Sequence, residues 1–334
     1  PPLSRERTAM NNLLELDNLQ TTFRTRDGDV HAVRGVSFHV QPGELVGIVG
    51  ESGCGKSVTC KSIIQLLGSN GHITGGQIRF DNDDLAQKTP KQMRAIRGNQ
   101  IAMIFQDPMT ALNPVVTIGR QMSEILMRNK GLNKKAARAT SIAMLEKVGI
   151  AEAERRYDQY PHEFSGGMRQ RVMIAIALSC DPKLLIADEP TTALDVTIQA
   201  QILRLLKSLQ LKTHTAILLI THDLGVVAQV CSRVVVMYGG LVMEEGSVED
   251  IFYRPAHPYT QGLLASLPHP EQTSHRLSPI EGSPPGLLNP PPGCPFAERC
   301  PHRMPQCERQ PAFYITDPGH RAACWLLADK EVQA

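Results

Sequence analysis

The sequence predicts an α/β fold in which a largely parallel sheet, flanked by helices, carries a phosphate loop. Residues Gly50 to Ser57 read G-E-S-G-C-G-K-S, a complete G-x-x-x-x-G-K-[ST] pattern, directly after the apolar run at 45–49. Later apolar runs at 184–187, 216–220 and 234–237 have the length and composition of buried strands. Strand and helix signals alternate over the first three quarters of the chain, as they do in a sheet built from β-α-β units.

The composition limits the classes of protein that are possible. The chain has 334 residues, enough for one sizeable domain and a smaller one. Its 35 basic and 33 acidic residues nearly balance, so no overall charge favours nucleic acid or an anionic membrane surface. The sequence contains no apolar run of 18 residues and no signal-peptide pattern. We therefore expect a cytosolic protein that reaches a membrane only through its partners.

The first half of the chain divides into strands followed by helices. Strands are expected near Leu14, Val33, Val46 and Ile78. From about 117 to 160, apolar residues recur at helical spacing without clear strands. That interval predicts a helical insertion.

Composition also predicts the domain boundaries. Met10 offers a natural start, so residues 1–9 are interpreted as an N-terminal extension or a cloning remnant. After Leu267 a segment that cannot form regular helix or sheet contains Pro268, Pro270, Pro279, Pro284, Pro285, Pro290, Pro291 and Pro292. The predicted units are a main domain at 10–267 with a helical subdomain at about 110–165, a Pro-rich linker at 268–293 and a Cys-rich appendage at 294–334.

The phosphate loop predicts a site for a nucleoside triphosphate. Its glycines let successive backbone N–H groups face the phosphates, and the helix that follows adds the positive end of its dipole. Lys56 is expected to reach the β- and γ-phosphates, and Ser57 offers a hydroxyl oxygen to Mg²⁺. The alternative, a chance Gly-rich turn, is disfavoured by the order strand, loop, helix. The predicted nucleotide contacts here are Gly50, Ser52, Gly53, Cys54, Gly55, Lys56, Ser57 and Val58.

Polar residues follow two of the predicted strands. Asp188, after the run at 184–187, is predicted to hold Mg²⁺, and Glu189 to polarise the water that attacks the γ-phosphate. Without a phosphate loop, such a pair would more often be a strand end that meets solvent. His222 follows the run at 216–220, at the sheet edge where ligands bind, so we expect it to donate to the γ-phosphate or orient the water. A lone histidine is otherwise more often structural.

The segment at 164–171, F-S-G-G-M-R-Q-R, precedes the strand with the two carboxylates. Alone it is a helix N-cap that exposes N–H groups to an anion. Together with the phosphate loop, Gln106 in F-Q-D-P, the Asp-Glu pair, Asp195 in A-L-D and His222, it resembles the signature of ATP-binding-cassette (ABC) ATPases, which carry these six motifs in this order. The resemblance covers residues 12–265. It implies an ABC-type nucleotide-binding domain with a RecA-like core, an antiparallel β subdomain and a helical subdomain.

The ABC resemblance implies roles for further residues. Two cassettes pair head to tail, so that the signature of each completes the nucleotide site of the other. Phe23 lies about one residue from the aromatic position that stacks on adenine in many cassettes, and it is equally consistent with a core residue. The resemblance implies catalytic roles for Glu189, His222, Lys56 and Gln106. It implies that Ser57, Gln106 and Asp188 are ligands of Mg²⁺. To the nucleotide contacts it adds Phe23, Gln106, Asp188, Ser165, Gly166, Gly167 and Asp195.

Met168 replaces the glutamine of the common signature, a variant that resembles the ATPases of oligopeptide and dipeptide importers. The segments at 109–114, M-T-A-L-N-P, at 191–201, T-T-A-L-D-V-T-I-Q-A-Q, and at 257–261, H-P-Y-T-Q, resemble the same subfamily. This resemblance implies ATP-driven peptide import at the cytoplasmic face of the plasma membrane. The implied partners are a second, related ABC ATPase, two transmembrane permeases and, indirectly, an extracytoplasmic peptide-binding protein.

Other functions remain open at this point. The same class of transporter could carry another cargo, such as nickel or an antimicrobial peptide, because the cassette need not touch the solute. A non-transport ABC ATPase that acts on DNA or ribosomes is disfavoured, because the tail has few aromatic residues and no basic cluster, and we expect no nucleic-acid partner. A purely regulatory nucleotide binder conflicts with intact Lys56, Asp188, Glu189 and His222.

Four cysteines lie close together in the tail. Cys294, Cys300, Cys307 and Cys324 are separated by five, six and sixteen residues, which in a cytosolic protein favours a metal site over disulfides. Thiolates suit an iron–sulfur cluster or Zn²⁺, and unliganded thiols are the third possibility. The peptide-importer resemblance implies a [4Fe–4S] cluster. The remaining cysteines are interpreted as small core or loop residues: Cys54, Cys60, Cys180 and Cys231.

Overall fold

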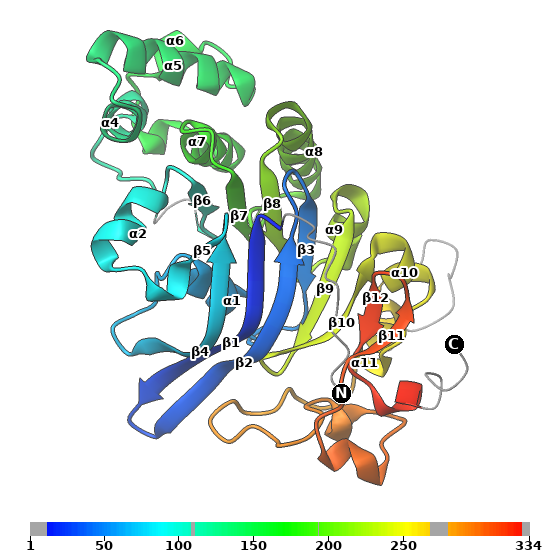
Figure 1. Ribbon diagram of the computed structural model, residues 1–334. Helices are drawn as coiled ribbons and strands as arrows, with labels where there is room; N and C mark the ends of the chain where they lie inside the picture. Colours follow the sequence, from blue (N-terminus) through cyan, green and yellow to red (C-terminus); the bar gives the residue numbers. More distant parts are fainter. Residues whose placement is uncertain (1–11, 108–110, 193, 268–279, 329–334) are drawn as a thin grey trace.

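The computed structural model describes residues 12–107, 111–192, 194–267 and 280–328. Within them the larger sheet has eight strands in the order β11-β12-β10-β9-β3-β8-β7-β6, and the smaller sheet has four in the order β2-β1-β4-β5. Figure 1 shows the smaller sheet, in blue and cyan, in front of the larger one. The predicted α/β class is confirmed.

Parallel strands make up the larger sheet from β9 to its edge at β6. Alternate residues of one strand enter different cores: Leu184 and Ile186 pack in the cluster that contains α1, and Leu185 and Ala187 pack in the cluster that contains α7 and α8. Both faces of the sheet are buried, which explains the continuous apolar runs in the sequence. The elements of this layer are β3 (Leu45–Val49), β6 (Ile101–Ile104), β7 (Leu184–Asp188), β8 (Ala216–Ile220), β9 (Arg233–Tyr238), α1 (Lys56–Ile63), α7 (Gly166–Leu178), α8 (Val196–Thr213) and α9 (Leu224–Val230).

The smaller sheet is antiparallel, as the ABC resemblance implies. β1 pairs with both β2 and β4, so Leu16 lies opposite Phe38 on one side and Ile78 on the other. These side chains belong to the same buried cluster as Cys60 and Ile63 of α1, so the smaller sheet packs on that helix. Its strands are β1 (Leu14–Thr25), β2 (Gly28–Val40), β4 (Gly71–Phe80) and β5 (Asp83–Asp84).

Helices occupy the interval in which the sequence predicts an insertion. α4 is followed by Gly131, whose φ of 66° suits a residue without Cβ, and the side chain of Asn133 caps α5. A buried hydrogen bond of 2.6 Å joins the hydroxyls of Ser123 and Tyr157. Figure 1 shows α4, α5 and α6 at one end of the molecule, beyond α7. The remaining helices are α2 (Pro90–Ile96), α4 (Ile118–Lys130), α5 (Lys134–Lys147), α6 (Ala153–Arg156), α10 (Val248–Tyr253) and α11 (Pro258–Ala265).

The C-terminal segment contributes a hairpin to the larger sheet. β12 pairs antiparallel with β10, which places Ala322 opposite Glu244 and Arg321 opposite Glu245. The tail therefore shares its backbone hydrogen bonding with the main domain. The elements involved are β10 (Leu241–Ser247), β11 (Tyr314–Asp317), β12 (His320–Ala322) and the short 3₁₀ helices η3 (Ala297–Arg299) and η4 (Pro305–Glu308).

The described part of the Pro-rich segment, residues 280–293, contains neither helix nor strand. It lies against β2, where the backbone N–H of His31 donates to the carbonyl oxygen of Leu287 at 2.8 Å. The guanidinium of Arg34 donates to the carbonyl oxygen of Pro291 at 2.6 Å. Several predictions fall outside the described residues, namely those on residues 1–9, Met10, Pro268, Pro270 and Pro279.

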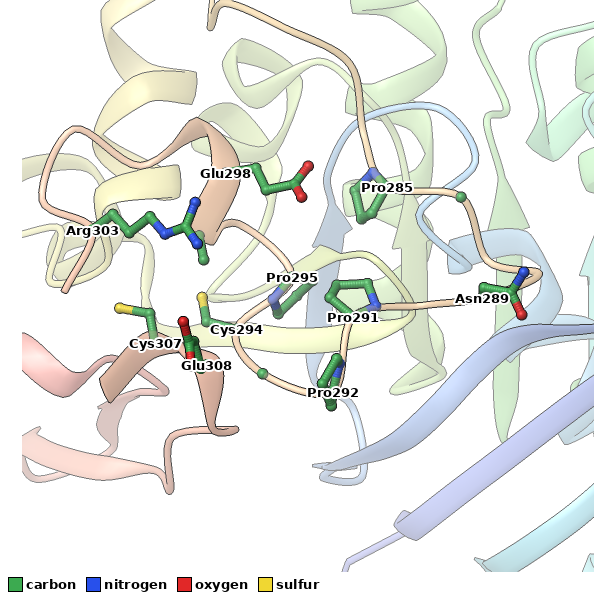
Figure 2. Close-up of a pocket in the computed structure, with 13 residues that line it drawn as sticks. Pro285, Asn289, Pro291, Pro292, Cys294, Pro295, Glu298, Arg303, Cys307 and Glu308 are labelled. Carbon is green, nitrogen blue, oxygen red and sulfur yellow. The ribbon is translucent and has the colours of Figure 1, made fainter. Parts of the chain in front are cut away.

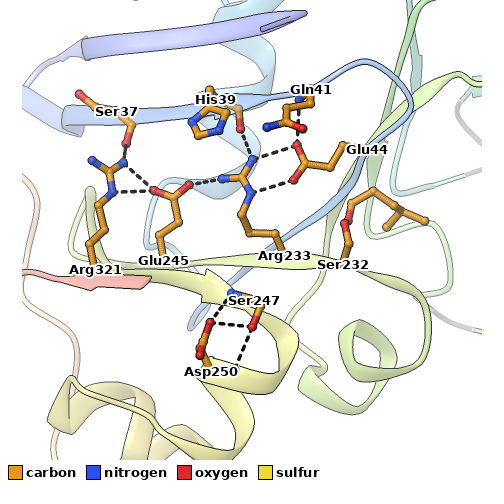
Figure 3. A network of polar contacts seen from close by, with 11 residues as sticks. Ser37, His39, Gln41, Glu44, Ser232, Arg233, Glu245, Ser247, Asp250 and Arg321 are labelled. Atoms are coloured by element: carbon orange, nitrogen blue, oxygen red, sulfur yellow. Dashed lines mark hydrogen bonds and ion pairs between the residues drawn. The ribbon is translucent and has the colours of Figure 1, made fainter. Parts of the chain in front are cut away.

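A network of ion pairs connects the C-terminal hairpin, the larger sheet and the smaller sheet (Figure 3). The carboxylate of Glu245 on β10 lies between Arg321 of β12, at 2.8 Å, and Arg233 of β9. Arg233 also pairs with Glu44 at 2.8 Å, and Arg321 donates to the carbonyl oxygen of Ser37 in β2 at 2.9 Å. Because Glu245 is 3% exposed, its charge depends on these two guanidinium groups.

We expect Glu245→Ala to lower the free energy of unfolding by about 3 kcal/mol, because Arg233 and Arg321 lose the carboxylate that they share. Chemical denaturation of the full chain, followed by circular dichroism, measures the change. Glu249→Ala, which removes an exposed carboxylate on α10, is the control. Equal unfolding midpoints for the two variants would contradict a stabilising role for the network.

Candidate active site

The phosphate loop connects the end of β3 to the start of α1. Gly50 and Gly55 have φ angles of 150° and 100°, which disfavour a side chain. A Cβ at Gly50 would lie 2.1 Å from the carbonyl oxygen of Met237, and a Cβ at Gly55 would lie 2.5 Å from that of Ala32. Both positions therefore require glycine, and the loop backbone lies directly against β9 and β2.

A cavity of about 200 Å³ opens over this loop. Lys56 lines it and is 5% exposed, and its ammonium donates to the carbonyl oxygens of Gly50 at 2.7 Å and Glu51 at 2.9 Å. The backbone N–H groups at the start of α1 suit an anion here. Most of the predicted phosphate contacts thus lie together, since the lining consists of Ala32, Ser52, Gly53, Cys54, Gly55, Lys56, Ser57, Val58, Gln106 and Glu189.

Ser57 and Asp188, two of the three predicted magnesium ligands, lie together. The hydroxyl of Ser57 donates to Oδ1 of Asp188 at 2.8 Å, although the two residues are far apart in the chain. Adjacent oxygens of an octahedral Mg²⁺ shell lie about 3.0 Å apart, so these two donors suit the ion. Burial raises the pKa of Asp188, and the hydrogen bond from Ser57 opposes this effect.

Glu189 lies directly after Asp188, where three side chains from different segments meet its carboxylate. Gln106 donates to Oε2 at 2.8 Å, Thr192 donates to the same oxygen at 2.9 Å, and Nδ1 of His222 lies 3.3 Å from Oε1. Its φ of 48° is unusual for a residue with a side chain. Partial burial raises the pKa of Glu189, but the hydrogen bonds from Thr192 and His222 outweigh it and hold the pKa below its ordinary value. The carboxylate is therefore ionised and available as a base.

Thr192 is a site residue that the sequence did not single out. The sequence feature that could have identified Thr192 is its position three residues after Glu189, in the segment T-T-A-L-D. We expect Thr192→Val to raise the pKa of Glu189, because a hydrogen bond to the ionised form is lost. In a plot of the ATP hydrolysis rate against pH, the acidic limb should move to higher pH. The rate on the plateau above about pH 8 should be unchanged, which serves as the internal control. An acidic limb that stays in place would contradict this role for Thr192.

The signature residues do not line this cavity. Ser165 caps α7, its hydroxyl accepting a hydrogen bond from Met168 N at 3.4 Å, and both Ser165 and Gly166 are exposed. Asp195 caps α8 by accepting a hydrogen bond from Ile198 N at 2.9 Å. Among the described lining residues, none comes from these segments. Ala193, which precedes Asp195 in the predicted A-L-D motif, lies outside the described residues, as do Pro108, Met109 and Thr110.

Phe23 lies on β1, opposite Val30 of β2 and Gly71 of β4. Its ring is so close to Gly71 that a Cβ there would lie 2.7 Å from it, and 3.2 Å from the Cβ of Leu67. Phe23 is half-buried and is not among the residues that line the phosphate-loop cavity. Its stacking on adenine stays a prediction.

The four tail cysteines converge on one small cavity of about 10 Å³. Cys294 and Cys307 are joined by a hydrogen bond of 2.9 Å between backbone N and O. Burial raises the pKa of Cys294 to about 12, and the neighbouring thiols add to the shift. A groove of about 580 Å³ lies beside this cavity, and Figure 2 shows Cys294 and Cys307 on its wall next to Arg303. The donor set thus suits a soft metal centre.

A second cluster of potential ligands does not need a metal. The ligand atoms of Asp250, Asp317 and His320 all lie within 4.8 Å of one another. The guanidinium of Arg254 donates to Asp250 and lies 3.8 Å from the carboxylate of Asp317. The arginine supplies the positive charge that a cation would bring.

The other four cysteines are dispersed, as predicted. Cys54, Cys60 and Cys180 are at most 5% exposed, and Cys231 is half-buried.

None of the helices in the described ranges is both long enough and apolar enough to cross a membrane.

The site belongs to a phosphate-loop nucleotide hydrolase. It combines a phosphate loop, a serine–aspartate pair suited to Mg²⁺ and an ionised glutamate, all at the ends of parallel strands. The family model for the ABC transporter matches residues 33–192, and that for the oligopeptide/dipeptide transporter C-terminal region matches residues 243–307. The dimeric post-hydrolysis structure of the ATP-binding cassette MJ0796, bound to ADP and Pi, superposes with a TM-score of 0.64. The two sequences are 28% identical, and the match covers 70% of this chain and 98% of the MJ0796 chain.

Curated relatives are similar over nearly the whole chain. The dipeptide transport ATP-binding protein DppD of Bacillus subtilis (strain 168) is 57% identical over 319 residues, 95% of each chain. The oligopeptide transport ATP-binding protein OppD of Salmonella typhimurium (strain LT2) is 51% identical over 315 residues, 94% of each. This chain therefore belongs to the ABC transporter family, within the ATP-binding proteins of oligopeptide and dipeptide transporters. The resemblance drawn from its motifs is confirmed.

Proposed function

We propose that this chain binds ATP with Mg²⁺, hydrolyses it, and thereby powers the import of oligopeptides or dipeptides. The observation that carries the proposal is the carboxylate of Glu189, held by three side chains beside the phosphate-loop cavity. The identity to the DppD and OppD proteins over most of the chain supports the peptide cargo.

Each residue of the site has a part in hydrolysis that its chemistry explains. Lys56 and the backbone N–H groups of the loop neutralise and orient the β- and γ-phosphates. Ser57 and Asp188 would hold Mg²⁺, which when bound stabilises negative charge on phosphate oxygens. Glu189 accepts a proton from the attacking water, and His222 orients this base and the water.

The signature completes the nucleotide site of a second cassette. Ser165 and Gly166 are exposed at the N-terminus of α7, a helix long enough for its positive end to attract a phosphate. Gly167 and Asp195 complete the same contact. ATP between the two cassettes favours the closed dimer, and hydrolysis shifts the population towards the open one. A related chain, giving a heterodimer, is the proposed partner.

Transport requires partners within the membrane. Gln106 follows β6 and touches Glu189, so it links the chemistry to the helical region, including the described residues 111–116. A cytoplasmic helix of one of the two permeases would bind there, which places the chain peripherally at the cytoplasmic face of the plasma membrane. An extracytoplasmic peptide-binding protein would deliver the cargo to them.

The tail is proposed to hold a [4Fe–4S] cluster on Cys294, Cys300, Cys307 and Cys324. The four thiols line one cavity, and thiolates suit either an iron–sulfur cluster or Zn²⁺. The resemblance to peptide-importer ATPases favours the cluster. On this proposal, residues 10–267 form the ATPase domain, 268–293 the linker and 294–334 the metal-binding appendage.

The proposal is tested by affinity purification of the full chain from native membranes in mild detergent. Mass spectrometry of the partners and metal analysis are made on the same sample. Two permeases, a second cassette, a peptide-binding protein and iron are expected. Ribosomal or DNA-repair proteins in their place would contradict the transport function while leaving the ATPase site intact.

A further inference from the structure

The Cys-rich tail makes a direct contact with the phosphate loop. Arg299, which immediately precedes Cys300, places Nη1 2.7 Å from Oε2 of Glu51, the residue after Gly50 in the loop. The Arg299 side chain is 7% exposed and that of Glu51 is 23% exposed. A largely buried ion pair therefore joins the two segments, which are 248 residues apart.

Every nitrogen of the Arg299 guanidinium has a partner. Besides Glu51, Nη1 donates to the hydroxyl of Tyr238 at 2.9 Å. Nε donates to the carbonyl oxygen of Glu281 at 2.8 Å, and Nη2 to that of Ile280 at 2.9 Å. Such a planar set of donors fixes the guanidinium in one orientation, so it can hold the Glu51 carboxylate in place.

The main chain of Glu51 is held by the same region. Its backbone N–H donates to the hydroxyl of Tyr259 at 2.9 Å, and Tyr259 is fully buried against Phe296 and Tyr238. The carbonyl oxygen of Glu51 accepts from the ammonium of Lys56 at 2.9 Å. Glu51 therefore supplies one of the two carbonyl oxygens, the other being that of Gly50, that hold the phosphate-binding lysine.

We propose that Arg299 is a positioning residue of the ATP site, and that through Glu51 it makes ATP affinity depend on the Cys-rich segment. Removing the guanidinium leaves the Glu51 carboxylate and the Tyr238 hydroxyl without their buried donor. The phosphate loop then loses a fixed anchor, and the Lys56 ammonium has a wider range of positions. The inference rests on the proposed function only in taking ATP as the ligand.

A double-mutant cycle on the full chain tests this inference with Arg299→Gln, Glu51→Gln and the double variant. The dissociation constant for ATP is measured by calorimetry, KM and kcat by phosphate release, and iron by metal analysis. Each single variant is expected to weaken ATP binding and raise KM about ten-fold, while kcat changes less than about two-fold. The double variant should be no weaker than either single variant, because both remove the same contact.

Two further variants separate positioning from folding. Arg299→Lys keeps the charge and should recover part of the affinity. Arg303→Gln removes an exposed arginine of the same segment, seen in Figure 2, and should leave affinity and iron unchanged. Unchanged affinity in Arg299→Gln, effects that multiply in the double variant, or loss of iron together with loss of affinity in Arg299→Gln would each overturn the inference. A wild-type chain that binds no ATP would instead overturn the proposed function.

Discussion

Glu189→Gln is expected to lower the rate of ATP hydrolysis about 10³-fold while ATP still binds. The amide has nearly the shape of the carboxylate, so Thr192 can still donate to its oxygen, but the side chain can no longer accept a proton from water. The phosphate loop, which holds the nucleotide, is unaffected. Phosphate release measures the rate, and calorimetry with ATP measures the affinity.

Two comparisons make this prediction specific. Glu146→Gln, at an exposed position on α5, should hydrolyse ATP at the wild-type rate. Glu189→Gln should bind ATP without hydrolysing it, so ATP stays between the two cassettes. When ATP is present, this variant should therefore also favour the dimer. Hydrolysis at the normal rate would show that Glu189 is not the base.

Much of the active site was predictable because its chemistry follows buried strands. Asp188, Glu189 and His222 come directly after apolar runs of strand length, and the ends of parallel strands meet at one edge of a sheet. The phosphate loop follows the same rule after β3. Ser57 and Asp188, both predicted as Mg²⁺ ligands, accordingly lie 2.8 Å apart.

The contacts of the tail were not predictable in this way. Arg299 ends the short 3₁₀ helix η3 and Glu51 lies in the phosphate loop, and no periodicity or motif relates positions 248 residues apart. β11 and β12 are four and three residues long, too short for an alternating pattern to be recognised. Their place in the sheet depends on Glu245, whose burial between two arginines appears only when β9, β10 and β12 are assembled.

Cys307→Ser is expected to remove the proposed metal centre of the tail completely. The wild-type chain should carry about four iron atoms and as many acid-labile sulfides after anaerobic purification, and the variant none, because a cube without its fourth thiolate is labile. Cys231→Ser, which changes a half-buried thiol outside the tail, should retain the iron. Zinc in the wild-type chain would establish the alternative metal, and a metal-free wild-type chain would indicate unliganded thiols.

Loss of the metal centre should also affect two parts of the tail differently. The hairpin of β11 and β12 is held to β10 by backbone pairing and by the Arg321–Glu245 ion pair, so it should stay resistant to limited proteolysis. Residues 294–307 have little regular structure of their own and should become sensitive, because a small segment without a core depends on its metal. Arg299 lies inside that segment, so Cys307→Ser should weaken ATP binding to the same extent as Arg299→Gln, and the two changes together should add nothing further. Intact ATP affinity in an iron-free chain would mean that the contact between Arg299 and Glu51 forms without the cluster.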